Sequence, residues 1–373
     1  MRKRDILFLS TNLFNPYMPL RKYWFSKSFN ENGFRVVFVE FPYTYLAYLK
    51  RGFKLENTTK LERISDDYFV LKSFPILPFF KKYKFINRID NKLFYSFIKQ
   101  NLEEIGFNPD LVWTYPPFFP DALTYFNAKT VYDCADDYAS LPGLINPNYV
   151  LELERRTVNT VDKVIVTDNP YLEERLRNFG KEPLIIPNGV DYKLFSSWLE
   201  KKDNVEHKKR IIYVGNVSFW FDFELVHRIA SAFKDFEIMI VGFASVDISS
   251  FKKDPNINFV GKLKQEEFVG LLSESSVAII PFKVNELTRK VDPLKVYEYL
   301  AAGVPVVSTS VGNISKLPVY IGEDYDDFIE KIKDAIENDS LEKREKQTLE
   351  ARKFSWEERG KVILDIAREL LSD

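Results

Sequence analysis

Short apolar runs alternate with amphipathic segments along most of the chain. In the first half, residues 5–10 and 36–40 are continuous apolar runs, the pattern of strands buried on both faces. Residues 21–32, which are followed by Gly33, predict a helix between these strands. Strand, helix and strand at this spacing predict a βαβ unit in a parallel sheet. Further strands are expected at 110–114, 129–132 and 162–167, and further helices at 121–126, 151–160 and 170–179.

The second half repeats this alternation of apolar runs and amphipathic segments after a turn signal at Asn188 and Gly189. The lysine-rich run 200–210 is expected to be an exposed loop. Strands are expected at 211–214, 237–241, 257–260, 277–281 and 304–308, and helices at 222–233, 265–273, 325–353 and 356–371. The predicted fold class is therefore α/β, with two Rossmann-like domains, 1–184 and 185–354, facing each other across a cleft, and a terminal helix at 355–373.

A helix with well-defined ends is predicted between Asp292 and Gly303. Asp292 suits the N-cap, Pro293 the first helical position, and Gly303 the left-handed residue past the end. Lys295 and Glu298 are three residues apart and share one helical face. A lysine and a carboxylate beside a helix N-terminus could hold a phosphate and a sugar hydroxyl together. The alternative is an ordinary exposed ion pair.

Residues 72–99 are the most basic part of the chain, with seven Lys or Arg, one acidic residue and many aromatic side chains. Basic and aromatic residues together suit peripheral contact with an anionic membrane, with rings at headgroup depth and lysines near phosphates. The alternative is an amphipathic helix with a core-facing aromatic stripe and a solvated lysine face. The sequence has no helix-turn-helix, zinc or RNA-binding signature, so we expect no nucleic-acid partner.

Three carboxylates, Asp133, Asp136 and Asp137, follow the strand at 129–132. The carboxyl ends of parallel strands are where open α/β sheets bind ligands. Asp133 comes first and is the candidate general base, which would take a proton from an acceptor hydroxyl. Such oxygen ligands also suit magnesium or manganese, but no further ligands accompany them, so we expect no metal. A further alternative is that Asp136 or Asp137 caps the following segment.

The loop at 11–20, after the first strand, has no Gly-x-Gly-x-x-Gly motif. This argues against a dinucleotide-binding dehydrogenase. Because the loop reaches the same crevice, Asn12, Tyr17 and Arg21 are candidates for an acceptor site, and the alternative is that they are loop residues facing water.

Composition is that of a folded protein with two cores. The chain has 373 residues, 45% of them apolar, and a net charge of -1, which argues against nucleic-acid binding through bulk charge. Cys134 is the only cysteine, so a disulfide framework within the chain is excluded and a cytoplasmic location is favoured. The first ten residues do not resemble a signal peptide, and no apolar stretch is long enough to span a membrane.

Six short motifs occur in a fixed order in the chain. They are residues 186–191 (IPNGVD), 213–215 (YVG), 259–261 (FVG), 292–295 (DPLK), 298–303 (EYLAAG) and 305–307 (PVV). This set resembles GT-B glycosyltransferases, especially family four and its teichuronic-acid-type relatives. The resemblance spans nearly the whole chain and is strongest after residue 186. It implies a terminal helix that crosses back onto the first domain, and a reaction with no bound metal or cofactor.

The resemblance also implies roles for individual residues. Glu298 matches the carboxylate that binds the nucleotide ribose, and Asp133 has the strand-end position of the family's catalytic histidine or of an aspartate base. The other residues implied in nucleotide-sugar binding are Gly215 and Asn216 near the diphosphate, Gly261, Lys262 and Leu263 near the base, and Leu294 and Lys295 at the helix start.

The chain departs from the family pattern at the residues that usually contact the donor sugar and its diphosphate. Family members carry two glutamates separated by seven residues, and here the first is replaced by Lys290. An arginine and a lysine that often hold the diphosphate are replaced by Asn216 and Asp222. Other cations must therefore balance the negative charge of the diphosphate. We predict that Arg289, Lys290 and Lys295 replace the missing arginine and lysine.

The predicted function is hexosyl transfer from a nucleotide sugar to a hydroxyl acceptor during cell-surface polysaccharide synthesis. The acceptor would be lipid-linked or a saccharide, and the enzyme would lie peripherally at the inner face of the membrane. Two alternatives remain, a nucleotide-sugar epimerase of the same fold and a non-catalytic membrane-associated binding protein. An epimerase would convert the donor without an acceptor, whereas a binding protein would show no turnover.

Overall fold

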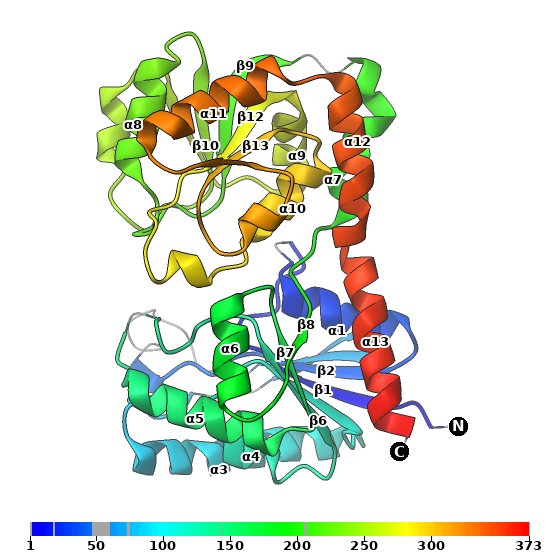
Figure 1. Ribbon diagram of the computed structural model, residues 1–373. Coiled ribbons are helices and arrows are strands. Elements are labelled where there is room, and N and C mark those ends of the chain that lie inside the picture. Colours follow the sequence, from blue (N-terminus) through cyan, green and yellow to red (C-terminus); the bar gives the residue numbers. More distant parts are fainter. Residues whose placement is uncertain are drawn as a thin grey trace. The chain divides into compact units, whose positions relative to one another are not determined.

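The computed structural model describes residues 2–17, 19–46, 60–72, 75–141, 143–204 and 207–372. The chain divides into two compact units, each with its own sheet (Figure 1). Unit 1 comprises Met1–Ile186 and Arg359–Asp373, and unit 2 comprises Pro187–Glu358. The division lies close to the boundary expected between residues 184 and 185.

Unit 1 contains an eight-stranded sheet in the order β3-β4-β2-β1-β5-β6-β7-β8. Its strands are β1 (Asp5–Leu9), β2 (Arg35–Val39), β3 (Leu61–Ser65), β4 (Tyr68–Leu71), β5 (Leu111–Thr114), β6 (Lys129–Cys134), β7 (Lys163–Val166) and β8 (Leu184–Ile185). All pairings are parallel except that of β3 with β4. The first βαβ unit is confirmed, because α1 (Arg21–Glu31) joins two parallel neighbours, β1 and β2.

Helices cover both faces of the unit 1 sheet. On one face lie α3 (Lys84–Glu104), α4 (Pro120–Leu123), α5 (Pro147–Thr160) and α6 (Pro170–Asn178), whose apolar residues share one core cluster with the strands. On the other face, α1 packs the rings of Phe25 and Phe29 against Trp113 of β5. The carboxyl ends of the strands are left to loops, which is where a parallel sheet binds ligands.

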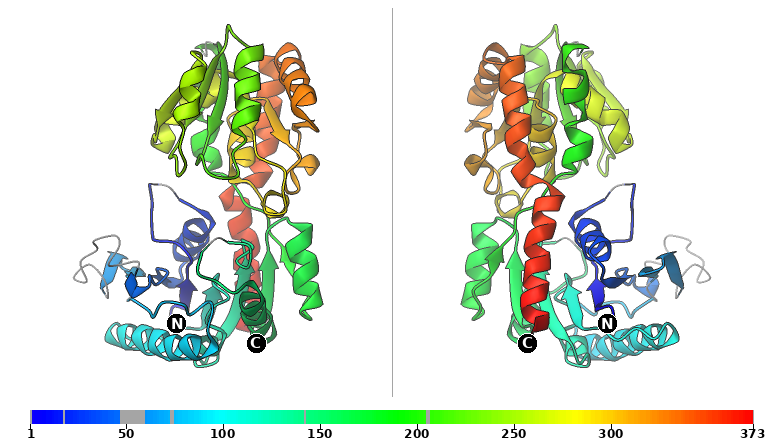
Figure 2. Two further views of the ribbon diagram at one scale, coloured as in Figure 1. Left: turned by 90° about the vertical axis from the view of Figure 1, so that its left-hand side faces the viewer. Right: turned by 90° about the vertical axis from the view of Figure 1, so that its right-hand side faces the viewer.

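The terminal helix α13 (Trp356–Ser372) begins in unit 2 and contributes its residues from Arg359 onward to unit 1. A side chain at Gly360 would begin 2.5 Å from Ser28 Oγ, so α13 lies close against α1. Lys163 Nζ lies 3.0 Å from Glu369 Oε1 at the same helix. Figure 2 shows the last part of α13, in red, beside the unit 1 sheet. No helix among the described residues is both long and apolar enough to cross a membrane.

Unit 2 contains a six-stranded sheet, parallel throughout, in the order β11-β10-β9-β12-β13-β14. Its strands are β9 (Lys208–Val214), β10 (Glu237–Val241), β11 (Ile257–Gly261), β12 (Ser275–Ile280), β13 (Val306–Thr309) and β14 (Tyr320–Gly322). Its α-helices are α7 (Tyr192–Phe195), α8 (Phe223–Ala232), α9 (Gln265–Glu274), α10 (Leu294–Ala301), α11 (Tyr325–Glu337) and α12 (Leu341–Ala351). Short 3-10 turns occur at η2 (Ser197–Asn204), η3 (Ser249–Lys253), η4 (Thr288–Lys290), η5 (Ile314–Lys316) and η6 (Arg352–Phe354).

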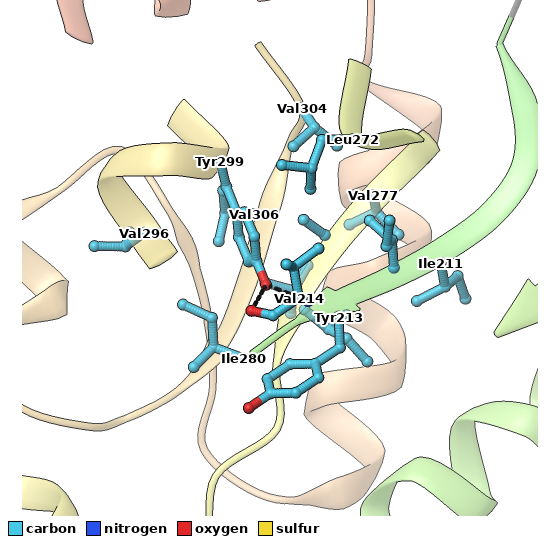
Figure 3. Close-up of a cluster of buried hydrophobic side chains, with 14 of the residues drawn as sticks. Ile211, Tyr213, Val214, Leu272, Val277, Ile280, Val296, Tyr299, Val304 and Val306 are labelled. Carbon is cyan, nitrogen blue, oxygen red and sulfur yellow. Dashed lines mark hydrogen bonds between the residues drawn. The ribbon is translucent and has the colours of Figure 1, made fainter. Parts of the chain in front are cut away.

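A buried tyrosine ties helix α10 to the central strand of unit 2 (Figure 3). The hydroxyl of Tyr299 accepts from the amide of Val214 at 2.8 Å and donates to its carbonyl at 3.1 Å. Tyr299 is fully buried, and these two bonds satisfy buried backbone groups of Val214, the last residue of β9. The result is that α10 is fixed at the carboxyl end of β9.

Four expectations about the secondary structure are wrong. The stretch 325–353 is not one helix, because α11 ends at Glu337 and α12 begins at Leu341. Strands β3 and β4 lie between residues 41 and 104, where no strand was expected, and β8 follows β7 at residues 184–185, where none was expected either. The run 200–210 is not one loop, since it contains part of η2 and the start of β9. β3 and β8 are short edge strands with largely exposed side chains, so they lack the apolar runs that mark the central strands.

Candidate functional site

Three glycines stand at the carboxyl ends of the neighbouring strands β9, β10 and β11 in unit 2. The amide of Gly215 donates to Val241 at 2.8 Å, and the amide of Gly242 donates to Gly261 at 2.8 Å. A Cβ on Gly242 would lie 1.9 Å from the carbonyl oxygen of Gly215, so the two backbones approach too closely for any side chain. These strand ends therefore expose bare backbone to a ligand.

Lys295 lies against this glycine row. It belongs to the first turn of α10, and a Cβ on Gly215 would come within 2.7 Å of its Cε. Its Nζ is 5.5 Å from the ring centroid of Tyr213 and 4.9 Å from that of Phe282. Burial lowers the pKa of Lys295 to about 8, with Glu298 opposing the shift. The absence of a side chain at Gly215 thus makes room for a desolvated cation at the end of β9.

Glu298 follows Lys295 by one turn of α10. Burial raises the pKa of its carboxyl to about 7, although the nearby Lys295 lowers it. Within the described parts of the chain, the Glu298 carboxylate has no hydrogen-bonding partner and no ion pair with Lys295 within 4.0 Å. The alternative of an exposed ion pair is therefore wrong for these two residues. A desolvated carboxylate with unused acceptor sites is suited to receiving hydroxyl donors.

The predicted start of this helix is wrong by one residue. Helix α10 begins at Leu294, its N-cap is Pro293, and no side chain caps it. Asp292 instead accepts from the Asn188 amide at 2.7 Å and from the Tyr297 hydroxyl at 2.8 Å. The carboxylate therefore fixes the Asn-Gly turn to α10. The predicted end is confirmed, since Gly303 has a left-handed φ of 71° just past the helix.

The other residues expected near the nucleotide lie at or near the same strand ends. Asn216 is exposed, and its carbonyl accepts from the Tyr213 hydroxyl at 2.8 Å. Lys262 is exposed directly after Gly261, whereas Leu263 packs partly on the core of unit 2. Leu294 is half-buried at the start of α10. Their roles toward a base or diphosphate stay predictions.

The cations expected to replace the missing pair differ in their surroundings. Arg289 is exposed in η4. Lys290 Nζ lies 2.8 Å from Glu286 Oε1, so part of its charge is already balanced. Asp222 is the N-cap of α8, where its Oδ1 accepts from the Leu225 amide at 3.1 Å. This helix-capping role explains a carboxylate at that position without a phosphate contact.

Asp133 is buried in unit 1 and does not reach solvent. Its side chain is 0% exposed, and its carboxylate accepts from Arg21 Nε and Nη2 at 3.0–3.2 Å. Arg21, which is also buried, donates through Nη1 to the carbonyl of Ile186 at 2.8 Å. Deprotonating an acceptor hydroxyl requires contact with it, which this buried ion pair prevents. The geometry therefore argues against Asp133 as the general base and against Arg21 as an acceptor contact.

The other two carboxylates after β6 have separate partners. Asp137 pairs with Arg175 of α6 at 2.6 Å, and its side chain is buried. Asp136 is 56% exposed and lies 3.7 Å from Nζ of Lys22, a buried lysine that sequence reasoning missed. No three His, Cys, Asp or Glu side chains of the described chain gather as a metal site would require. Asp136 is thus the one member of the trio that an acceptor could reach.

The described residues of the loop after β1 make hydrogen bonds within unit 1. The backbone amide of Asn12 donates to Ser10 Oγ at 2.9 Å, which shapes the loop. Tyr17 is 80% exposed, as the alternative of a residue facing water predicts.

The fold of both units is that of GT-B glycosyltransferases, two parallel-sheet α/β domains, so the predicted α/β class with two Rossmann-like domains is confirmed. A sucrose-phosphate synthase from Thermosynechococcus elongatus superposes with a TM-score of 0.71 at 14% identity, covering 99% of this chain and 100% of that one. Anabaena HepE in complex with UDP superposes with a TM-score of 0.66 at 13% identity, covering 99% of this chain and 100% of that one. At these identities the likeness shows the fold.

The sequence comparisons give a narrower class. Residues 208–338, which lie within unit 2, match the family described as "Glycosyl transferases group 1". The chain is also 26% identical over 226 residues to TuaH of Bacillus subtilis (strain 168), which is named for a glycosyltransferase role in teichuronic acid biosynthesis. That match spans 56% of this chain and 57% of TuaH. The family resemblance seen in the sequence is confirmed.

Proposed function

We propose that this protein is a glycosyltransferase that moves a sugar from a nucleoside-diphosphate sugar to a hydroxyl group of an acceptor. The observation that carries the proposal is the strand end of unit 2, where Lys295 lies on Gly215 and Glu298 keeps an unused, desolvated carboxylate. The group 1 family match over 208–338 and the UDP complex of HepE support the same assignment.

Charged side chains and backbone amides would hold the donor. Glu298 would accept from the ribose hydroxyls, and Lys295 would lie beside the diphosphate above the glycine row. As the sugar departs, negative charge grows on the diphosphate, and a fixed cation and backbone amides stabilise that charge without covalent chemistry. In this scheme the protein uses no cofactor and no metal, because Lys295, with Arg289 and Lys290 nearby in the chain, supplies the positive charge.

The base that activates the acceptor would be Asp136 and not Asp133. Of the carboxylates after β6, Asp136 alone has a largely exposed side chain, and Lys22 at 3.7 Å keeps it in place. A general base at the carboxyl end of β6 would take the proton from the attacking hydroxyl.

The acceptor would be lipid-linked or a saccharide. The sugar transfer would take place at a membrane surface during surface-polysaccharide synthesis. The name of TuaH supports the pathway, and the rings of segment 72–99 support the location. Tyr83 and Phe85 are 50% and 73% exposed beside Lys82 and Lys84. Phe80 and Phe94 are buried in the core, as the structural alternative predicted, and Phe74 lies outside the described residues. Membrane contact would therefore involve only the start of α3 and the turn before it.

The first test is a panel of nucleoside diphosphates and nucleotide sugars in a thermal unfolding assay. A ligand that binds only the folded protein at about 100 times its Kd adds about 2.7 kcal/mol, which is a shift of a few degrees. Glu298→Gln should lose the shift, and an unchanged melting temperature with every nucleotide contradicts the proposal.

Product analysis then separates the transferase from the epimerase and the binding protein. A transferase consumes the donor when the acceptor is present, an epimerase converts it without acceptor, and a binding protein leaves it unchanged.

A further inference from the structure

A lysine with no acidic partner lies among aromatic rings in unit 1. Lys81 belongs to the turn between β4 and α3, in the segment 79–83. Its Nζ is 4.1 Å from the ring centroid of Phe118, 5.3 Å from that of Phe41 and 5.4 Å from that of Phe80. Within the described parts of the chain, its ammonium group has no ion pair and no hydrogen bond. We call Lys81 and these three rings the lysine cage.

The cage is assembled from several loops at the carboxyl ends of the unit 1 strands. Phe41 follows β2, Phe118 follows β5, and Phe80 and Lys81 follow β4. The amide of Asn146, in the loop after β6, donates to the carbonyl of Lys81 at 3.1 Å. Four strand-end loops therefore fix the lysine at the edge of the sheet where ligands of α/β proteins bind.

The backbone that places Lys81 in the cage is itself strained. Phe79 has a φ of 68°, and it is the one non-glycine residue of the described chain with a positive φ. The amides of Lys82 and Tyr83 both donate to the Phe79 carbonyl, at 2.8 and 3.1 Å, which closes the turn. A left-handed bulky residue persists only where its surroundings hold it, and such strain is concentrated at binding sites.

The cage leaves hydrogen-bonding capacity unused. Ring faces attract the charge of an ammonium group, but they do not replace the three acceptors that its N–H groups take in water. Burial accordingly lowers the pKa of Lys81 to about 8. A methionine of similar length would fill the same space without this penalty, so packing alone does not explain a lysine here.

We propose that the lysine cage binds a phosphate-type oxyanion carried by the acceptor. This inference rests on the proposed glycosyltransferase function and specifies its acceptor. The ring of Phe118 contacts that of Tyr138 at 5.6 Å, and Tyr138 lies two residues after Asp136 in the same loop. Both rings are buried, and they connect the cage to the loop that carries the exposed carboxylate of Asp136, so an acceptor whose phosphate lies at Lys81 would contact both loops. The phosphate oxygens would take the N–H donors that the rings leave free.

The direct test follows the Lys81 amine by NMR after reductive ¹³C-methylation, which keeps the positive charge of lysines. The probe is inorganic phosphate added to the full-length chain. Three nearby rings give Lys81 a distinct resonance, which is identified by its loss in Lys81→Met. The expected result is a saturable shift of that resonance, whereas exposed Lys92 on α3 shows no saturable shift. A Lys81 resonance that does not respond overturns the proposal.

A second measurement separates an acceptor site from a general anion site. Two acceptors are compared, the same saccharide with and without a phosphate ester. Lys81→Met should raise KM at least tenfold for the phosphorylated acceptor while leaving KM for the phosphate-free one and kcat for both nearly unchanged. Lys92→Met, the matched control, should change neither. Equal KM changes for both acceptors would overturn the acceptor assignment, and phosphate binding at Lys81 without any KM change would show a site for free phosphate only.

The same variant also tests whether Lys81 contributes to the stability of the fold. Because the half-buried ammonium is partly desolvated, which is unfavourable, Lys81→Met should melt at or above the wild-type temperature. A lower melting temperature would show that the lysine serves the fold, which overturns the proposal. If no nucleotide stabilises the protein, the proposed function fails, but phosphate binding at Lys81 can still be observed by NMR. The two failures are thus distinguishable.

Discussion

The two units use charge at the carboxyl ends of their strands in opposite ways. In unit 1, Arg21 and Asp133 are buried and satisfy each other through several hydrogen bonds. In unit 2, Lys295 and Glu298 are half-buried and partly desolvated, but they form no ion pair with each other within 4.0 Å. Burial shifts the pKa of both residues toward neutrality, to about 8 for the lysine and about 7 for the glutamate.

This difference separates a structural pair from a binding site. A buried ion pair whose hydrogen bonds are complete has nothing left to offer a ligand, and breaking it destabilises the fold. A desolvated charge without a partner is unfavourable by itself and becomes favourable when a ligand of the right chemistry arrives. The predictions below test this assignment at each pair.

The largest effect is expected for Asp133→Asn, because it would leave Arg21 buried without a counter-charge. We expect a loss of about 3–5 kcal/mol in the free energy of unfolding, measured by urea denaturation. Asp136→Asn is the matched control, since its half-exposed side chain should change stability by less than about 1 kcal/mol while lowering turnover. An Asp133→Asn protein of wild-type stability that has lost only its turnover would restore Asp133 as the base.

The next effect is expected for Lys295→Met, which keeps the length of the side chain and removes the charge. Affinity for a nucleoside diphosphate should fall by about 1.5–3 kcal/mol, or about 10- to 150-fold, by isothermal titration. Stability should not fall, because the desolvated ammonium is lost. Lys234→Met, at an exposed lysine of unit 2, should bind like the wild type. Equal affinities for the Lys295 and Lys234 variants would refute the assignment of the diphosphate to Lys295.

A smaller effect is expected for the double variant Arg289→Ala, Lys290→Ala. Arg289 is exposed and Lys290 is already paired with Glu286, so their attraction for a diphosphate is screened and partly balanced. We expect the affinity to fall by about 1 kcal/mol or less, and the loss should shrink as salt is added. If affinity does not change at low salt, these residues do not replace the arginine and lysine of the family.

The elements that the sequence predicts well are those whose local pattern has a single cause. The central strands are continuous apolar runs because helices cover both faces, and β10 occupies the predicted residues 237–241. Gly303 ends α10 because the chain needs a left-handed residue there. The edge strands β3 and β8 form by pairing with one neighbour each, β4 and β7, and their side chains are largely exposed, so their own residues carry no comparable apolar signal.

For the candidate site, too, the sequence predicts only what the local pattern determines. The sequence places Lys295 and Glu298 on one helical face, but it does not show that Gly215 leaves space for the lysine or that burial shifts both pKa values. It places Asp133 at a strand end, yet it cannot show that Arg21, 112 residues away, donates to both oxygens of that carboxylate. Opposite charges far apart in sequence are common, and only the fold reveals which of them meet.

The pH dependence of nucleotide-sugar affinity tests the central claim most directly. A nucleotide sugar is the right probe because its diphosphate has no group that titrates near neutrality. Binding needs Glu298 ionised and Lys295 protonated, so affinity should be greatest between about pH 7 and pH 8. It should fall about tenfold per pH unit below the glutamate pKa and again above the lysine pKa, because one proton is involved on each side. Glu298→Gln should remove the acidic limb and Lys295→Met the alkaline limb, whereas a flat profile, or one that both variants retain, would contradict the account.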